Sequence, residues 1–156
     1  MKPEVSGNQY TFRVSLKRRT SIWRTMMLRG DQTLDELHET IFAAFDRDDE
    51  HLYAFYFPSA TARRSPRGAR SKEYVSPYGF EPGAVARDGR YNAAAVRLDD
   101  LVLKEGQTFE YLFDFGDEWW HAIKVDALGA SDPTTVYPRI VDRRGASPVQ
   151  YPEEGE

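Results

Sequence analysis

The residues best suited to chemistry gather at one predicted turn. Asp114, Asp117 and Glu118 place three carboxylates close together, and Trp119 and His121 follow directly. Such a set could serve a metal-assisted or hydrolytic reaction, because a carboxylate can act as a base and an imidazole as an acid or a ligand. A catalytic carboxylic acid needs a raised pKa, which a solvent-exposed turn does not provide. The alternative is that an Asp here accepts hydrogen bonds from nearby backbone N–H groups.

The tripeptide Asp114-Phe115-Gly116 matches the magnesium-binding motif of protein kinases. The chain has no glycine-rich loop and no His-Arg-Asp catalytic loop, and 156 residues are too few for two kinase lobes. It also lacks a phosphate-binding loop and a nucleophile elbow. We therefore assign no catalytic residue from a motif.

Metal binding has little support in the sequence. There is no Cys, and His38, His51 and His121 lack the short spacings that bring ligands together. We expect no metal and no cofactor. His38 and His121 fall on apolar faces, which predicts partly buried imidazoles, each satisfied by a hydrogen bond. The candidate binding residues are His38, Asp114, Asp117, Trp119 and His121.

A basic, aromatic segment is set in an acidic chain. The chain carries a net charge of −4, yet residues 58–97 hold eight basic and three acidic residues, with four Tyr or Phe among them. This composition is compatible with binding a phosphate backbone and stacking bases. The alternative is a loop kept solvated by its charge. The candidate nucleic-acid contacts are Arg63, Arg64, Arg67, Arg70 and Lys72.

The elements that position these residues follow from hydrophobic periodicity. Alternation of apolar and polar residues predicts a strand over Tyr10–Lys17, and Ile22–Leu28 predicts its antiparallel partner. An amphipathic pattern predicts a helix over Thr33–Asp46, and Thr33 with Glu36 has the spacing of a capping box.

Further strands flank a stretch rich in Pro and Gly. The continuous apolar run Leu52–Phe57 predicts a strand in the centre of the sheet. Pro58–Asn92 contains many turn residues, which argues against regular structure there. A short helical turn is expected at Leu98–Leu101, and a last strand at Val136–Val141.

Residues 108–128 predict a β-hairpin whose register can be argued. A two-residue loop would pair Phe113 with Trp120 and oppose an apolar face with a polar one. The pattern therefore selects an odd-length loop. We expect three residues, Gly116–Glu118, with Phe113 opposite His121.

Two consequences follow from this register. Glu110 would lie opposite Lys124, and Gly116 or Asp117 would adopt a positive φ. His121 would lie in an apolar environment, which lowers the pKa of its imidazole unless a carboxylate such as Asp117 or a helix residue pairs with it.

The order β-β-α-β, insertion, β-hairpin predicts an α+β fold. We expect a mainly antiparallel or mixed sheet with one principal helix on one face. Residues 1–156 would form a single domain, with 58–97 as a basic insertion and 152–156 as a disordered acidic tail. No signal peptide or membrane span is visible, so we expect a cytoplasmic protein.

The motifs together resemble a known family. Ile22-Trp23-Arg24, Thr33-Leu34-x-x-Leu37-His38, His51-Leu52-x-x-Phe55 and Arg97-Leu98-x-Asp100-Leu101 occur in order, followed by Tyr111-x-x-Asp114-Phe115-Gly116-Asp117-x-Trp119-x-His121-x-Ile123. The chain thus resembles the plasmid pRiA4b ORF-3-like family over about residues 8–150. The resemblance implies a small α+β protein, in some members associated with plasmids or mobile elements, and no transferable activity. Relatives commonly carry Pro-x-Cys where this chain has Pro138-Arg139-Ile140.

Our leading hypothesis is a non-enzymatic binding or protein-interaction module that uses the aromatic hairpin surface. The partner would be an unknown protein or a small ligand. One alternative is a metal-assisted or hydrolytic enzyme with a site around Asp114, Asp117, Trp119 and His121. The other is a nucleic-acid-associated protein that binds through residues 58–97.

Overall fold

A computed structural model describes residues 7–59 and 70–148. Arg63, Arg64, Arg67 and the predicted acidic tail at 152–156 lie outside these ranges. The strands are β1 (Asn8–Leu16), β2 (Trp23–Arg29), β3 (Tyr53–Pro58), β4 (Ser71–Val75), β5 (Ala86–Arg87), β6 (Arg90–Asn92), β7 (Thr108–Phe113), β8 (Trp119–Ala130) and β9 (Arg139–Arg144).

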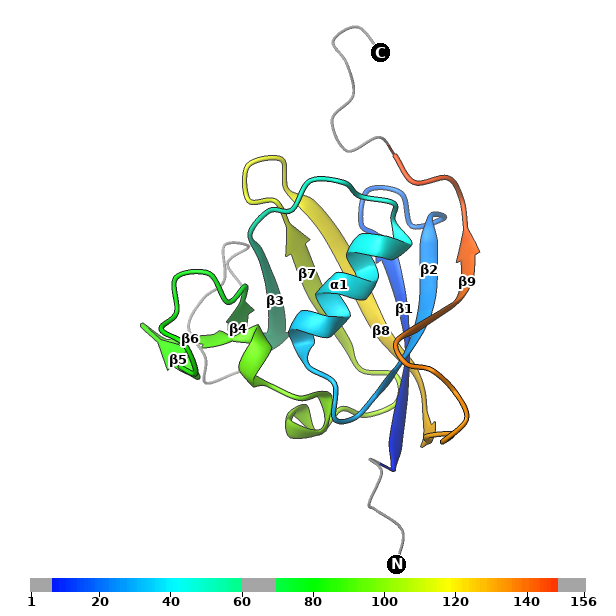
Figure 1. The fold of residues 1–156 in the computed structure, drawn as a ribbon. Helices are drawn as coiled ribbons and strands as arrows, with labels where there is room; N and C mark the ends of the chain where they lie inside the picture. The colour runs from blue at the N-terminus through cyan, green and yellow to red at the C-terminus, as the bar shows by residue number, and fades with distance from the viewer. Residues whose placement is uncertain (1–6, 60–69, 149–156) are drawn as a thin grey trace, which may run out of the picture.

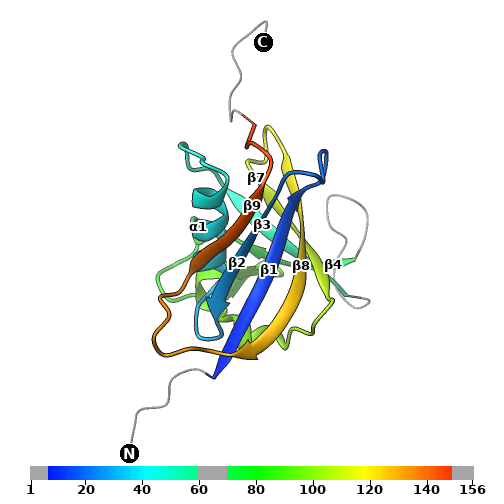
Figure 2. The same cartoon turned by 90° about the vertical axis from the view of Figure 1, so that its right-hand side faces the viewer.

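All of these strands belong to one sheet, in the order β5-β6-β4-β3-β7-β8-β1-β2-β9. Every pairing is antiparallel except the parallel contact of β4 with β6. The sheet curves around α1 (Leu34–Ala44), the one α-helix within the described ranges, which lies against one face (Figures 1 and 2). The predicted α+β class and element order are confirmed.

The helix begins where its capping box predicts. The hydroxyl of Thr33 accepts a hydrogen bond from the backbone N–H of Glu36, and the Glu36 carboxylate accepts one from the N–H of Thr33. The helix ends at Ala44, two residues before the predicted end, because Asp46 adopts a left-handed conformation with φ +56°. Arg47 follows this residue, and its side chain is buried against the rings of Phe45 and Phe113.

Alternation along the strands separates two faces. Phe12, Val14 and Met26 are fully buried on the face that α1 covers. The helix-covered face also carries the inward side chains of β3 and β7, all of which are aromatic: Tyr53, Phe55, Phe57, Phe109, Tyr111 and Phe113. The opposite, helix-free face has a small apolar cluster of its own, formed by Ala54, Tyr56 and Leu112 with Val75 and Trp120 packed against it.

The strand β3 lies in the interior of the sheet, as its continuous apolar run predicts. It pairs with β4 on one side and with β7 on the other. Its five residues Tyr53–Phe57 are buried on both faces of the sheet. This double burial explains why the sequence of β3 does not alternate.

The stretch Pro58–Asn92 contains regular structure, so the sequence prediction for it was wrong. The strand β4 pairs with β3, and the short strands β5 and β6 extend the sheet beyond β4. The many turn residues on either side of Ser71–Val75 hid the pattern of this short strand. The strand β4 forms because its backbone hydrogen-bonds to the edge of β3, a long-range contact that the local sequence of β4 does not predict.

The connection after β6 contains two short 3₁₀ helices, η1 (Ala93–Ala95) and η2 (Leu98–Leu101). The latter is the predicted helical turn. Asp99 in η2 packs on Gly30, where an added Cβ atom would lie 2.1 Å from the Asp99 Oδ1 atom. Gly30 therefore permits a close contact that any larger residue would block.

The hairpin β7–β8 has an odd-length loop, as predicted, but the loop has five residues, Asp114–Glu118. Phe113 pairs with Trp119 and Tyr111 with His121, so the register differs by two residues from the prediction. The faces are unchanged because a shift of two keeps every side chain on its side.

Two further predictions for this hairpin were wrong: the residues with positive φ and the partner of Glu110. Positive φ occurs at Asp114 (+65°) and Glu118 (+56°) rather than at Gly116 or Asp117. Glu110 lies opposite Ala122 and forms an ion pair with Lys17 of β1, so the predicted pair with Lys124 is absent.

The final strand β9 forms three residues later than predicted, at Arg139–Arg144, and pairs with β2. The sheet thus ends in the two-residue strand β5 on one side and in β9 on the other. Among the described residues, no helix is long and apolar enough to cross a membrane.

Candidate functional site

The sequence-predicted site residues do not converge on one point. Asp114 closes the hairpin loop: its Oδ1 atom accepts hydrogen bonds from the backbone N–H groups of Gly116 (3.1 Å) and Asp117 (3.2 Å). Its Oδ2 atom lies 3.6 Å from the Nε2 atom of His51. Asp114 therefore organises the loop, which is the structural alternative considered for it. The Asp117 side chain is exposed in the same loop.

His121 lies inside the protein, on the helix-covered face. Its side chain has no exposed surface, and the rings of Tyr111 and Phe45 lie 4.9 and 5.4 Å from it. The Nη2 atom of Arg47 donates a hydrogen bond to His121 Nε2 at 2.8 Å. Because a guanidinium can only donate, the imidazole is neutral and carries its proton on Nδ1, which lies 3.3 Å from the carbonyl oxygen of Tyr111.

Burial lowers the pKa of His121 well below its ordinary value, and the positive charge of Arg47 lowers it further. The pKa of His121 is thus lowered, as the sequence predicted. The partner is a cation from the residues just after α1, and not the carboxylate of Asp117.

Arg47 is a buried cation that sequence reasoning missed. Its guanidinium carbon lies 5.2, 4.9 and 5.6 Å from the ring centres of Phe45, Phe113 and Trp119. Burial lowers its pKa to about 10. Within the described ranges, its Nη1 atom and the indole nitrogen of Trp119 have no hydrogen-bond partner. The aromatic faces supply the attraction that a carboxylate would otherwise provide.

His38 forms a second buried polar chain. Its Nε2 atom lies 2.9 Å from the Glu50 carboxylate, and its Nδ1 atom lies 2.6 Å from the Tyr111 hydroxyl. Its ring stacks on Tyr53 at 3.8 Å, and the Tyr53 hydroxyl donates to Asp35. Both ring nitrogens of the buried His38 therefore have a partner, Tyr111 in the core and the partly exposed Glu50. In this arrangement the imidazole cross-links α1 to the sheet.

The structure describes two of the five predicted nucleic-acid contacts. Arg70 directly precedes β4, and its carbonyl oxygen accepts a hydrogen bond from Ser59. Lys72 is exposed on β4 opposite Phe57. Contact of this segment with nucleic acid stays a prediction.

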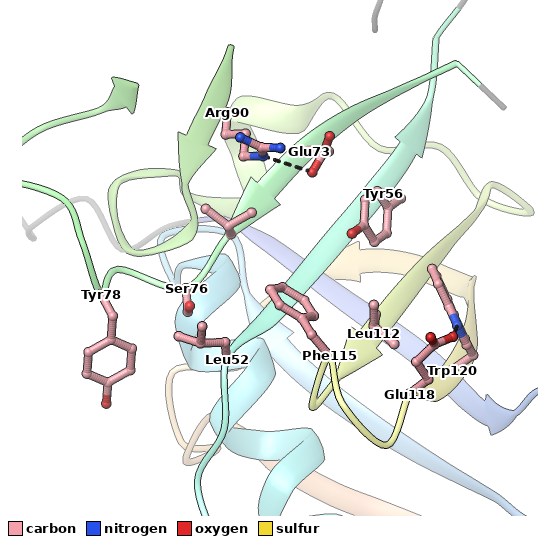
Figure 3. Close-up of a pocket in the computed structure, with 11 residues that line it drawn as sticks. Leu52, Tyr56, Glu73, Ser76, Tyr78, Arg90, Leu112, Phe115, Glu118 and Trp120 are labelled. Carbon is pink, nitrogen blue, oxygen red and sulfur yellow. Dashed lines mark hydrogen bonds and ion pairs between the residues drawn. The ribbon is translucent and has the colours of Figure 1, made fainter. Parts of the chain in front are cut away.

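A pocket lies on the helix-free face instead (Figure 3). It has a volume of about 660 Å³ and is formed where β3 and β4 meet the β7–β8 hairpin and β6. Its lining is mostly aromatic and aliphatic, and it includes a few polar groups. The lining residues are Leu52, Tyr56, Glu73, Val75, Ser76, Tyr78, Arg90, Leu112, Phe115, Glu118 and Trp120.

Neighbouring strands set the aromatic floor of the pocket. Tyr56 of β3 and Trp120 of β8 project from the same face, and their rings lie 5.6 Å apart with Leu112 of β7 between the two strands. The hairpin loop contributes Phe115 and Glu118 to the lining (Figure 3). Phe115 is 44% exposed although it is large and apolar.

Two polar contacts and one shifted pKa characterise the wall of the pocket. Arg90 Nε lies 3.3 Å from the buried carboxylate of Glu73. The indole N–H of Trp120 donates to Glu118 Oε1 at 3.2 Å. Burial, together with the negative charge of Glu73, raises the pKa of Tyr56 to about 12, so its hydroxyl stays protonated at neutral pH.

The sequence contains one signal for this pocket. Leu112 and Trp120 are large apolar residues at positions of the hairpin where a solvated face would carry polar ones. Tyr56 occupies the equivalent position of β3. Three such residues on neighbouring strands indicate an apolar patch on the outer face.

The molecule is therefore an α+β protein with one sheet, one helix-covered face and an amphipathic pocket on the other face. The chain belongs to the plasmid pRiA4b ORF-3-like protein family, whose family model matches residues 8–153.

The chain is similar to two further proteins, each described as uncharacterised or of unknown function. It is 32% identical over 105 residues to the uncharacterized protein y4hQ of Sinorhizobium fredii, covering 64% of this chain and 45% of that protein. The chain thus spans less than half the length of this curated relative. It also resembles the crystal structure of MM3350, a protein of unknown function from Methanosarcina mazei, with a TM-score of 0.71 and 22% identity over 92% of this chain and 72% of the other. The second likeness concerns the fold alone.

Proposed function

We propose that this protein is a non-enzymatic binding module whose ligand enters the pocket on the helix-free face. The observation that carries the proposal is the pocket itself. The hairpin contributes Leu112, Phe115 and Trp120 to its lining, and its volume of about 660 Å³ lies within the range typical of ligand sites.

The lining has the composition that such sites share. Tyr56, Leu112 and Trp120 supply apolar contact surface, while Glu73, Ser76 and Glu118 supply a few polar groups that can orient a ligand. A ligand that covered Phe115 and Tyr78, which are 44% and 65% exposed, would remove apolar surface from water.

The positions of the candidate catalytic residues support binding over catalysis. His121 and Trp119 lie on the helix-covered face, whereas the pocket lies on the other face of the sheet. Asp114 is occupied by backbone N–H groups of its loop. The described residues contain no group of His, Asp and Glu side chains arranged to hold a metal ion.

The test uses the indole N–H signals of the three Trp residues in a ¹⁵N-labelled sample. A library of small organic compounds is added, and compounds that bind are expected to shift the Trp120 signal. Trp23 lies on the same face at the distant strand β2, so its signal should not move.

Matched variants complete the test. Phe115→Ser should weaken binding of every hit at least fivefold, while Trp23→Phe should leave the affinities unchanged. Hits that leave Trp120 unshifted, or that bind Phe115→Ser as tightly as the wild type, would overturn the proposal.

A further inference from the structure

We propose that the ligand of this pocket is an organic cation: an ammonium or guanidinium group attached to an apolar body. This inference rests on the proposed function. It follows from the joint arrangement of aromatic rings and carboxylates around the pocket (Figure 3).

Aromatic rings line the pocket on several sides. Tyr56 and Trp120 form the floor, Phe115 stands on the hairpin side, and Tyr78 is a further aromatic residue of the lining. The face of an aromatic ring carries partial negative charge, so a cation within about 6 Å of its centre is attracted to it. Several rings around one cavity are the arrangement that recognises substituted ammonium groups.

The charged groups of the pocket favour the same sign of ligand. Glu73 and Glu118 bring two carboxylates, and Arg90 brings one guanidinium. Arg90 is committed to Glu73, whose side chain is only 6% exposed and which would be costly to leave without a cation. The lining therefore has an excess of one negative charge.

Glu118 strengthens the attraction through Trp120. Its carboxylate accepts the indole N–H at 3.2 Å. A hydrogen bond to an ionised acceptor polarises the donor and increases electron density on the indole ring. A cation placed against Trp120 therefore meets both the ring and the carboxylate behind it.

The chain already uses this chemistry elsewhere on the same face. The guanidinium carbon of Arg13 lies 4.0 Å from the ring centre of Trp23. An anionic ligand would meet the opposite conditions in the pocket. It would face two carboxylates, and the positive charge of Arg90 is already offset by the carboxylate of Glu73.

A pair of probes of equal shape separates charge from apolar contact. Choline and 3,3-dimethylbutan-1-ol differ in that a quaternary nitrogen replaces a quaternary carbon. Each compound is titrated into ¹⁵N-labelled protein. Affinities are taken from the shifts of the indole N–H signal of Trp120 and the backbone amide signal of Phe115. We expect choline to bind at least tenfold more tightly than the neutral alcohol.

Variants then assign the effect to Glu118. Glu118→Gln should reduce the preference for choline at least threefold, while Glu105→Gln, which removes an exposed carboxylate outside the pocket lining, should not change it. An N-acetyl-trimethyllysine amide provides a third arm. Tighter binding of this amide than of choline assigns the cation to a modified side chain, and the reverse assigns it to a free small molecule.

The two proposals fail in different ways. If the neutral alcohol binds as tightly as choline at Trp120, the cation inference is overturned and the binding module stands. If the preference survives Glu118→Gln unchanged, the assignment to this carboxylate is wrong. If neither probe nor any library compound shifts Trp120, both proposals fall.

Discussion

The two faces of the sheet differ in the exposure of their polar groups. On the helix-covered face, His121, His38 and Tyr111 are buried, and their polar atoms meet partners inside the core. On the helix-free face, Glu118 and Arg90 line a pocket that opens to solvent. Asp114, His38 and His121, whose types suggest chemistry, thus hold the fold together. Of the aromatic side chains available to a ligand, the sequence motif contains Phe115 but not Tyr56, Tyr78 or Trp120.

This comparison explains how an imidazole can follow a carboxylate-rich turn without forming an active site. His121 and Trp120 are neighbours in sequence, yet alternation along β8 sends them to different faces. Substitutions on the two faces should therefore affect different properties.

The largest effect on stability is expected from His121→Leu. The Arg47 guanidinium would lose its hydrogen-bond acceptor while remaining buried, and the free energy of unfolding should fall by about 3 kcal/mol. Urea unfolding followed by fluorescence measures the change. His121→Gln keeps a possible acceptor and should lose less. If the Leu variant unfolded at the wild-type urea concentration, the pair would contribute nothing to the core.

Tyr111→Phe should have the next largest effect. Removing the hydroxyl leaves the Nδ1 atom of His38 without its buried partner, at a cost of about 2 kcal/mol. Tyr78→Phe removes the same atom from the exposed rim of the pocket and serves as control, with no expected change in stability. Equal losses in the two variants would contradict the distinction between the faces.

The stability of the helix-covered face should also depend on pH. The pKa of His121 is lowered in the folded protein, so below its ordinary value of 6.5 the unfolded chain binds a proton that the folded chain does not. Stability is therefore lost as the pH falls. The contribution of His121 is about 1 kcal/mol between pH 6.5 and pH 5.5.

The measurement compares urea unfolding of the wild type and of His121→Gln across this range, and the difference isolates His121. A wild-type curve parallel to that of the variant would show that the imidazole is protonated in the folded protein.

The smallest change in stability is expected from Phe115→Ser on the helix-free face. Phe115 is 44% exposed, so the free energy of unfolding should change by about 0.5 kcal/mol or less. The same variant should lose affinity for compounds that shift Trp120. A stability loss as large as that of His121→Leu would place Phe115 in the core and remove the contrast.

The features of the fold that the sequence predicted are those that depend on local patterns. The capping box of Thr33 and Glu36 lies within four residues, and the alternation in β7 and β8 fixes which side chains share a face. The length of the hairpin loop was not predictable in this way. It depends on Asp114 and Glu118 both adopting positive φ, a conformation that is uncommon outside glycine and that Asp tolerates better than Glu.

The buried Arg47–His121 pair and the pocket both depend on contacts that no local pattern contains. Arg47 and His121 are 74 residues apart, and nothing near Arg47 marks it as buried. The ion pair of Glu73 and Arg90 joins β4 to β6, two strands of a stretch predicted to be irregular. Leu112 and Trp120 are apolar at hairpin positions where alternation predicts polar residues. They lie on the helix-free face, where the pocket is.

The two ends of the sheet have a consequence for the behaviour of the protein in concentrated solution. An edge strand offers backbone groups to which another chain can add a strand. At one end, β5 has only two residues, which is too short to template much pairing. At the other end, four of the six residues of β9 are charged: Arg139, Asp142, Arg143 and Arg144. Two copies meeting along β9 would bring their arginines together, so this edge discourages sheet-to-sheet aggregation by repulsion.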